Sequence, residues 1–236
     1  VFSSCSPDFG APSLLDRFAQ IAPKVLIAVD GYQYGGRRFD RIDTVTRIAR
    51  ELPSVEKVIL VTALHPGVIP GELSGAVLWE EVMRTPSAAL TFMPVPFSHP
   101  IWILYSSGTT GVPKAITHGH GGMLLEHLKY LSFHNDVHPG DTFFWFTTTG
   151  WMMWNFLQAS LLAGAVMVLY DGSPAYPDLG VLWRLAATVP INHFGTSAPF
   201  LTACMQQGLS PTSQGALPAL RSIGSTGAPL TDVVFR

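Results

Sequence analysis

Hydroxyl side chains, glycines and one lysine gather in a single short stretch, Tyr105-Ser-Ser-Gly-Thr-Thr-Gly-Val-Pro-Lys114. Its glycines allow the backbone to turn sharply and to approach a ligand closely. Backbone amides, hydroxyl groups and a lysine ammonium group together suit the oxygen atoms of a phosphate. The stretch therefore predicts a phosphate-binding loop, whose candidate residues are Ser106, Ser107, Gly108, Thr109, Thr110, Gly111 and Lys114.

Two other interpretations compete for this stretch. Clusters of Gly, Ser and Thr often form an ordinary hairpin loop that binds nothing. The P-loop of nucleotide hydrolases needs a Lys followed by Ser or Thr and then a helix, whereas Ala115 follows Lys114 here. The residues on either side, 101–104 and 115–118, are short strand-like runs. We therefore reject the P-loop and expect a loop between two strands.

The composition indicates a chain with a large interior. Of its 236 residues, 47% are hydrophobic and 13% are charged, against about 25% charged in typical domains. Either much of the chain is interior, or more protein covers its surface. One or two domains fit this length. A net charge of −2 with no long run of like charge argues against a nucleic-acid partner.

Cysteine usage and the first residues indicate a cytoplasmic protein. Cys5 and Cys204 lack metal-ligand spacing, so we expect free thiols in a reducing compartment and no metal site. The N-terminus has no basic region followed by an apolar one, as a signal peptide would. Residues 143–170 carry no charge, but the threonines at 147–149 divide them into pieces shorter than the about 20 apolar residues of a membrane helix. We therefore expect no membrane partner.

Apolar runs alternate with segments of helical periodicity, which predicts an α/β fold of mostly parallel sheets covered by helices. Strands are expected at 24–29, 57–62, 143–146, 165–170, 191–194 and 220–223, and helices at 13–22, 40–52, 151–162, 179–188 and 199–207. Residues 30–38 are expected to form a turn-rich loop. Ligands bind beyond the carboxyl ends of strands, where we expect the phosphate loop and three further loops at 147–153, 195–199 and 224–229.

Residues 105–114 resemble the phosphate loop of the adenylate-forming enzymes, which include acyl-CoA synthetases, luciferases and peptide-synthetase adenylation domains. The resemblance covers essentially the whole chain. It implies an acyl pocket formed by Trp151, Met152, Met153 and Thr226, and an adenine-binding segment formed by Gly227, Ala228 and Pro229. Ala228 replaces a glutamate of related enzymes, so the resemblance implies only backbone contact with adenine there. Core packing is the alternative for the tryptophan and the methionines.

The resemblance also implies contacts with CoA. Arg37 and Arg38 lie in a stretch similar to the arginine-bearing loop that holds the CoA nucleotide, although Gln33 stands where an arginine is expected. A solvated turn is the alternative for both arginines. Ala198 lies in a segment similar to the one near the pantetheine tunnel.

Residues 2–24 are similar to the branch of this family that activates acetoacetate. This implies an ATP-dependent acid–CoA ligase of lipid metabolism, with acetoacetate, ATP, Mg²⁺ and CoA as its small-molecule substrates or co-substrates. The carboxylate would attack the α-phosphate of ATP, and the CoA thiol would then displace AMP from the acyl-adenylate. Lys114 and Thr109 are the implied catalytic residues, because the loop would offset charge as pyrophosphate leaves. The alternatives are another adenylate-forming enzyme, such as one similar to acetyl- or propionyl-CoA synthetases, and a non-catalytic nucleotide-binding module.

The adenylate-forming enzymes carry further motifs after the adenine-binding segment, which is residues 227–229 here. These motifs are not found before Arg236. We therefore expect residues 1–236 to be part of the large N-terminal adenylation domain, without the small C-terminal domain and inactive on their own. Such a fragment would leave an open apolar cleft around the acyl-pocket residues. Exposed apolar patches favour association, so self-association through this cleft is a further expectation.

Overall fold

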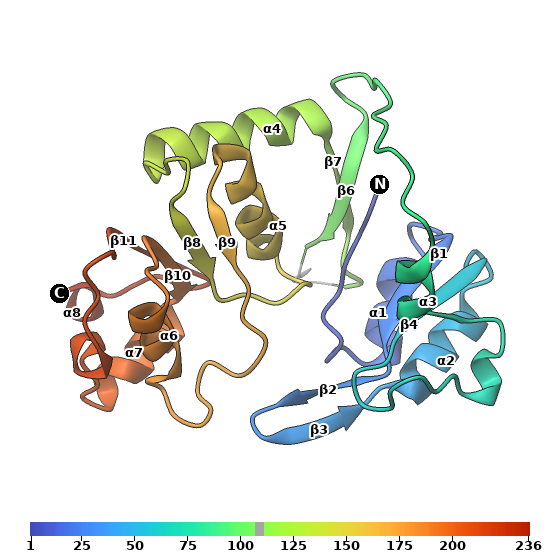
Figure 1. The fold of residues 1–236 in the computed structure, drawn as a ribbon, viewed down its shortest axis with the longest axis horizontal. Coiled ribbons are helices and arrows are strands. Elements are labelled where there is room, and N and C mark those ends of the chain that lie inside the picture. Colours follow the sequence, from blue (N-terminus) through green and yellow to red (C-terminus); the bar gives the residue numbers. More distant parts are fainter. Residues whose placement is uncertain (107–110) are drawn as a thin grey trace. The chain divides into compact units, whose positions relative to one another are not determined.

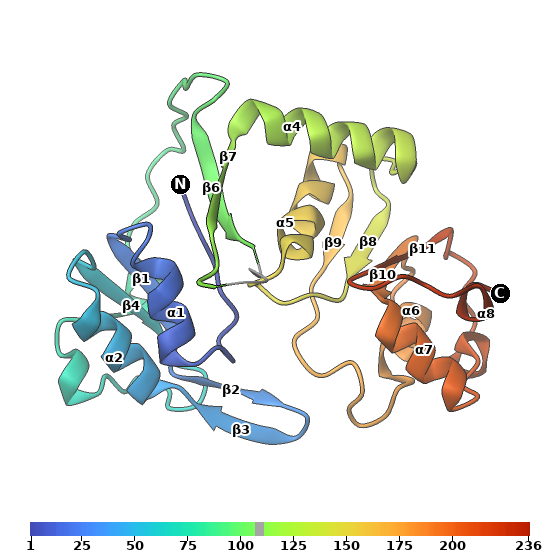
Figure 2. The same cartoon turned by 180° about the vertical axis from the view of Figure 1, so that it is seen from behind.

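The computed structural model describes residues 1–106 and 111–236. The chain divides into two compact units, Val1–His120 and Gly121–Arg236. Figures 1 and 2 show the elements of each unit from opposite sides. Each unit combines strands with helices, so the α/β fold predicted from the sequence is confirmed.

The first unit is built around a small parallel sheet with the strand order β1-β4-β5. The strands are β1 (Val25–Val29), β4 (Lys57–Val61) and β5 (Val77–Leu78). Helices α1 (Ala11–Phe18) and α2 (Ile42–Glu51) supply apolar side chains at helical spacing. These side chains, those of the strands, Leu52 after α2 and Leu73 between β4 and β5 form one core. Its members are Leu14, Phe18, Leu26, Val45, Ile48, Leu52, Val58, Leu60 and Leu73.

Residues 31–40 form a β-hairpin, so the loop expected over 30–38 was wrong. Strand β2 (Gly31–Tyr34) pairs in antiparallel fashion with β3 (Arg37–Asp40). Gly35 and Gly36 have φ angles of 57° and 75°. Two successive residues with positive φ make the tight turn whose twist suits a two-residue hairpin. The glycines that indicated a loop are the turn of this hairpin.

A second antiparallel pair in this unit supports the candidate phosphate loop. Strand β6 (Pro100–Tyr105) pairs with β7 (Ala115–Gly119), and Tyr105 lies opposite Ala115. Both strands were predicted, and the hairpin geometry shows that β6 does not belong to a parallel sheet. Between β5 and β6 the chain forms α3 (Trp79–Arg84), and η1 (Gly71–Leu73) precedes β5.

The second unit has a four-stranded parallel sheet with the order β11-β10-β8-β9. The strands are β8 (Thr142–Trp145), β9 (Val166–Val168), β10 (His193–Ser197) and β11 (Ser222–Thr226). Alternate side chains of a strand face opposite sides of the sheet. Phe143 and Trp145 therefore face α5 (Met152–Ala159), where both rings contact Phe156. Phe144 and Phe194 share the other face with α6 (Val181–Thr188) and α7 (Ala198–Gln206).

The remaining elements of this unit connect the sheet and its helices. They are α4 (His120–Lys129), η2 (Tyr130–His134), η3 (Ser160–Ala163), η4 (Pro211–Gln214) and α8 (Asp232–Phe235). Gly164 ends η3 in the left-handed conformation with φ of 75°, which is common for a glycine that follows a helix. Within 1–106 and 111–236, no helix is long and apolar enough to cross a membrane.

Candidate functional site

The base of the candidate phosphate loop is closed by backbone and hydroxyl hydrogen bonds. The amide of Ser106 donates to the carbonyl oxygen of Lys114 at 3.1 Å, and the amide of Lys114 donates to Ser106 Oγ at 3.4 Å. Lys114 is exposed, as is Gly111. The other candidate residues, Ser107, Gly108, Thr109 and Thr110, lie outside the described residues. The described part thus leaves the lysine side chain accessible beside a fixed loop base.

The two candidate CoA-binding arginines lie on the β2–β3 hairpin. Arg37 pairs with Tyr34 and Arg38 with Gln33 across the hairpin, and both arginines are exposed. An exposed guanidinium group on a hairpin is accessible to a phosphate and can bind it in bidentate fashion.

A buried carboxylate fixes the base of this hairpin. Asp30 is fully buried, and its carboxylate accepts hydrogen bonds from the amides of Ala63 at 2.7 Å and His65 at 2.6 Å. Its own carbonyl oxygen accepts from the amide of Arg41 at 2.7 Å. Asp30 therefore ties both the end of the hairpin and the loop after β4 to the carboxyl end of β1.

Three parallel strands of the second unit end at the same sheet edge. Strands β8, β10 and β11 are neighbours, so the segments after Trp145, Ser197 and Thr226 leave the sheet on one side. The expected loops at 195–199 and 224–229 were placed too early. Residues 195–197 belong to β10 and 224–226 to β11, because their backbones pair in register across the parallel sheet. Ala198 is buried at the start of α7, directly after β10.

The structure brings two of the predicted binding segments together at this edge. A Cβ atom built on Gly227 would lie 3.8 Å from Cζ2 of Trp151, and Gly227 has a φ angle of 87°. Thr226, the last residue of β11, lies opposite Ser197. Met152 is 46% exposed, whereas Met153 is buried in the core with Phe143 and Phe156. Ala228 and Pro229 are exposed beyond Gly227.

Trp145 is a residue at this edge that the sequence did not single out. A Cβ atom on Gly195 would lie 2.0 Å from Trp145 Cδ2, and one on Gly224 would lie 2.5 Å from Trp145 Cη2. Both distances are far below van der Waals contact, so the indole ring lies where these two side chains would be. The two glycines lie opposite each other on β10 and β11. The sequence signal that could have indicated this packing was a tryptophan and two glycines near the ends of three predicted strands.

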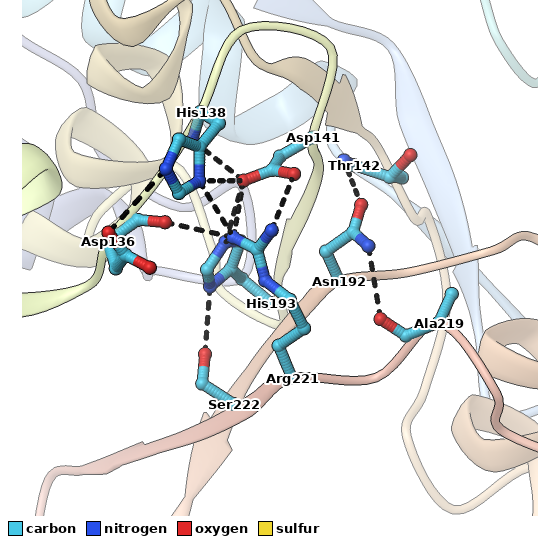
Figure 3. Close-up of polar contacts among 9 residues, drawn as sticks. All are labelled: Asp136, His138, Asp141, Thr142, Asn192, His193, Ala219, Arg221 and Ser222. Carbon is cyan, nitrogen blue, oxygen red and sulfur yellow. Dashed lines mark hydrogen bonds and ion pairs between the residues drawn. The ribbon is translucent and has the colours of Figure 1, made fainter.

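A polar cluster occupies the opposite, amino-terminal edge of the same sheet (Figure 3). Arg221 forms a bidentate ion pair with Asp141, with Nη1–Oδ1 and Nη2–Oδ2 distances of 3.1 Å and 2.6 Å. His193 Nε2 lies 3.2 Å from Asp141 Oδ2 and 3.0 Å from Arg221 Nη2. His193 Nδ1 lies 2.8 Å from Ser222 Oγ. The amide of His138 also donates to Asp141, at 2.7 Å.

The cluster contains a Ser–His–Asp series, but its electrostatics do not suit nucleophilic catalysis. A catalytic histidine must accept a proton, and the carboxylate then stabilises the imidazolium ion. Desolvation and the charge of Arg221 lower the pKa of His193 and outweigh the hydrogen bond with Asp141, which raises it, so the net effect opposes protonation. Asp141 is already paired with Arg221. We therefore interpret the cluster as a structural one, whose hydrogen bonds and ion pair link the amino-terminal ends of β8, β10 and β11.

Among the described residues, no group of three or more His, Cys, Asp or Glu side chains is arranged to hold a metal ion.

Comparisons with known proteins extend these observations. Residues 1–236 match the family described as "AMP-binding enzyme". The chain is 44% identical to the acetoacetyl-coenzyme A synthetase of Rhizobium meliloti (strain 1021), covering 100% of this chain and 36% of that protein. It is 38% identical to the acetoacetyl-CoA synthetase of Mus musculus, covering 98% of this chain and 35% of that protein.

A solved structure agrees with these relatives. The acetoacetyl-CoA synthetase from Streptomyces lividans matches with a TM-score of 0.93 and 49% sequence identity, over 100% of this chain and 36% of that chain. The fold of residues 1–236 is therefore that of the corresponding part of an adenylate-forming enzyme. The chain spans little more than a third of the length of the relatives it matches, at 36% and 35%.

Proposed function

This chain belongs to the AMP-binding enzyme family, and from that premise we propose that it carries the phosphate, acyl and CoA contacts of an acetoacetate–CoA ligase. In the proposed reaction, acetoacetate and ATP give acetoacetyl-adenylate and pyrophosphate, and CoA then displaces AMP to give acetoacetyl-CoA. Mg²⁺ would enter with the phosphates of ATP. The observation that carries the proposal is the match over all of residues 1–236 to relatives named acetoacetyl-CoA synthetase.

The geometry supports a role for each predicted segment. The accessible Lys114, next to a closed loop base, suits the β- and γ-phosphates, and a fixed positive charge would stabilise the departing pyrophosphate. We assign the acyl and adenine contacts to Trp151, Met152 and the segment that follows Thr226, since Trp151 and Gly227 are adjacent. The exposed arginines of the β2–β3 hairpin would bind phosphates of CoA.

We also propose that residues 1–236 form part of the large N-terminal adenylation domain. The length of the relatives supports this proposal, because the chain covers 36% of the Rhizobium meliloti protein. The sequence predicts no acyl-adenylate from these residues alone. The chemical assay therefore needs the longest polypeptide that carries them, whereas ligand binding can be measured on the chain itself.

Acetoacetate-dependent exchange of labelled pyrophosphate into ATP tests the first half-reaction. We expect exchange with acetoacetate to exceed that with acetate or propionate. Replacing Lys114 by Ala should lower it about 10- to 100-fold, because a hydrogen bond to a charged group contributes about 1.5–3 kcal/mol. Lys129→Ala is the matched control, since Lys129 forms a surface ion pair with Glu126. Faster exchange with acetate would instead support the acetyl-CoA synthetase alternative, and a chain that binds no ATP would contradict both.

A further inference from the structure

The last turn of α1 and the turn after it contact the β6–β7 hairpin on both sides of the phosphate loop. On the incoming strand, the Tyr105 hydroxyl donates to the carbonyl oxygen of Arg17 at 3.0 Å. On the outgoing strand, the side chain of Gln20 contacts the residues on either side of Lys114. Elements separated by more than 80 residues in the sequence therefore meet at the loop base.

The amide group of Gln20 makes three hydrogen bonds in this arrangement. Its nitrogen Nε2 donates to the carbonyl oxygens of Pro113 and Asp16, both at 2.7 Å. Its oxygen Oε1 accepts from the amide of Ala115 at 3.2 Å. Carbonyl oxygens can only accept and a backbone amide can only donate, so this orientation of the side-chain amide is the one that satisfies every partner. Gln20 thus binds the backbone just before and just after Lys114.

Gln20 lies just after a helix that packs into a hydrophobic core. Helix α1 packs into the core of the first unit through Leu14 and Phe18, which are both buried. The bond from Gln20 to the carbonyl oxygen of Asp16 holds the glutamine against the last turn of this helix. Lys114 itself is exposed, so packing around its side chain does not fix its backbone. Gln20 holds the backbone on either side of the lysine. The backbone of Lys114 itself is held by the hydrogen bond from the Ser106 amide to its carbonyl oxygen.

We propose that Gln20 is a positioning residue for the phosphate loop: it holds the backbone around Lys114 in place and so lowers the entropic cost of binding a phosphate there. The proposal rests on the function proposed above, because it takes Lys114 as the phosphate contact. A loop whose backbone is held in its bound conformation loses less conformational freedom when a ligand binds. Gln20 would therefore affect affinity for phosphate groups without touching them.

The test compares two probes that report on different parts of the ligand. Pyrophosphate would report on the phosphate loop, and adenosine on the segment after Thr226. We expect Gln20→Met, which keeps the length and loses every hydrogen bond, to weaken pyrophosphate binding by about tenfold, or about 1.4 kcal/mol. Adenosine binding should stay within twofold. Gln20→Glu keeps the acceptor for the Ala115 amide, but it sets a carboxylate oxygen against two carbonyl oxygens and adds negative charge beside Lys114, so its loss should be at least as large.

Gln206→Met is the matched control, because Gln206 is exposed at the end of α7. Amide exchange at Ala115 gives a second readout, and we expect it to be faster in Gln20→Met than in the unsubstituted chain. Equal pyrophosphate affinity of Gln20→Met and the unsubstituted chain would overturn the role of Gln20 and leave the proposed function standing. Equal losses for pyrophosphate and adenosine would show a general structural role and would also overturn it. An unsubstituted chain that binds neither probe would overturn the proposed function itself, and the role of Gln20 with it.

Discussion

Asp141 shows how a charged side chain can be buried at the sheet edge in this protein. Desolvation by itself would raise the pKa of Asp141, but hydrogen bonds from the His138 amide, His193 and Arg221 lower it below its ordinary value. Burial has the opposite consequence for the imidazole, because it lowers the pKa of His193 below 6.5. Both groups therefore favour the folded state when they are unprotonated. Asp136 and His138 also face this cluster.

The free energy of unfolding should fall on acidification because of His193. Its pKa is lowered in the folded state, so the unfolded chain binds more protons below pH 6.5 and gains stability relative to the folded one. The contribution of Asp141 is lost only at lower pH, as the pH falls below 3.8 and through its folded pKa. We expect His193→Gln to destabilise the chain by about 1–3 kcal/mol at pH 7.5, because it leaves buried partners unsatisfied, and to flatten the pH dependence between 7.5 and 5.

Urea denaturation at a series of pH values measures this effect. His134→Gln serves as the control, since His134 is exposed. An unchanged pH slope in His193→Gln, with the control also unchanged, would show that another group controls the acid sensitivity.

Local sequence patterns indicated candidate residues whose neighbours in the sequence form a motif. They gave no signal for residues whose hydrogen-bond partners are distant in the sequence. Lys114 could be proposed as a phosphate contact because the glycines and hydroxyls beside it indicate a loop. Gln20 could not, because its partner Pro113 is 93 residues away. The same holds for Asp141 and Arg221, which are 80 residues apart. A single sequence gives no signal for such a pair until the strands that carry its members are known to be neighbours.

At the scale of the elements, the glycines near the strand ends have a packing role. Gly195 and Gly224 were expected to mark loops, since glycine is common in turns. They instead lie in neighbouring strands, where the missing Cβ atoms make room for the indole ring of Trp145. The strands were predicted well where they are continuous apolar runs, as in β1 and β4. They were predicted poorly where small residues end a strand or turn a hairpin, because the same residues serve both purposes.

Gly195→Ala should destabilise the second unit. The added methyl group would overlap with Trp145 Cδ2, which lies 2.0 Å from the position of the new Cβ atom. Overpacking of a core costs about 1–3 kcal/mol, and the ring has to move to relieve it. Gly122→Ala in α4 is the control, because its Cβ atom would have nothing within 4 Å, and replacing a helical glycine gains about 0.5–1 kcal/mol. Thermal unfolding of both variants checks the opposite signs, and an increase in Tm for Gly195→Ala would contradict the packing role.

At the scale of the whole chain, the two units have hydrophobic cores of their own. The core of the first unit joins α1 and α2 to the β1-β4-β5 sheet. The second unit has one cluster on each face of its sheet, around Phe143 and around Phe194. The alternation of strands and helices predicted the α/β class and allowed one or two domains. It did not place the division at His120, although Gly119, Gly121 and Gly122 surround that position, because β7 passes directly into α4 there.

Two matched core substitutions test whether each core stabilises its own unit. Leu60 in the first unit and Leu182 in the second both have 0% of their surface exposed. Replacing a buried leucine by alanine costs about 2–5 kcal/mol. A unit with its own core can open without the other. We therefore expect Leu60→Ala to reduce amide protection in β4 and leave β10 protected, and Leu182→Ala to do the reverse. Hydrogen exchange followed by mass spectrometry resolves the two strands. Equal loss of protection in both strands, in either variant, would show instead that the two cores unfold as one cooperative structure.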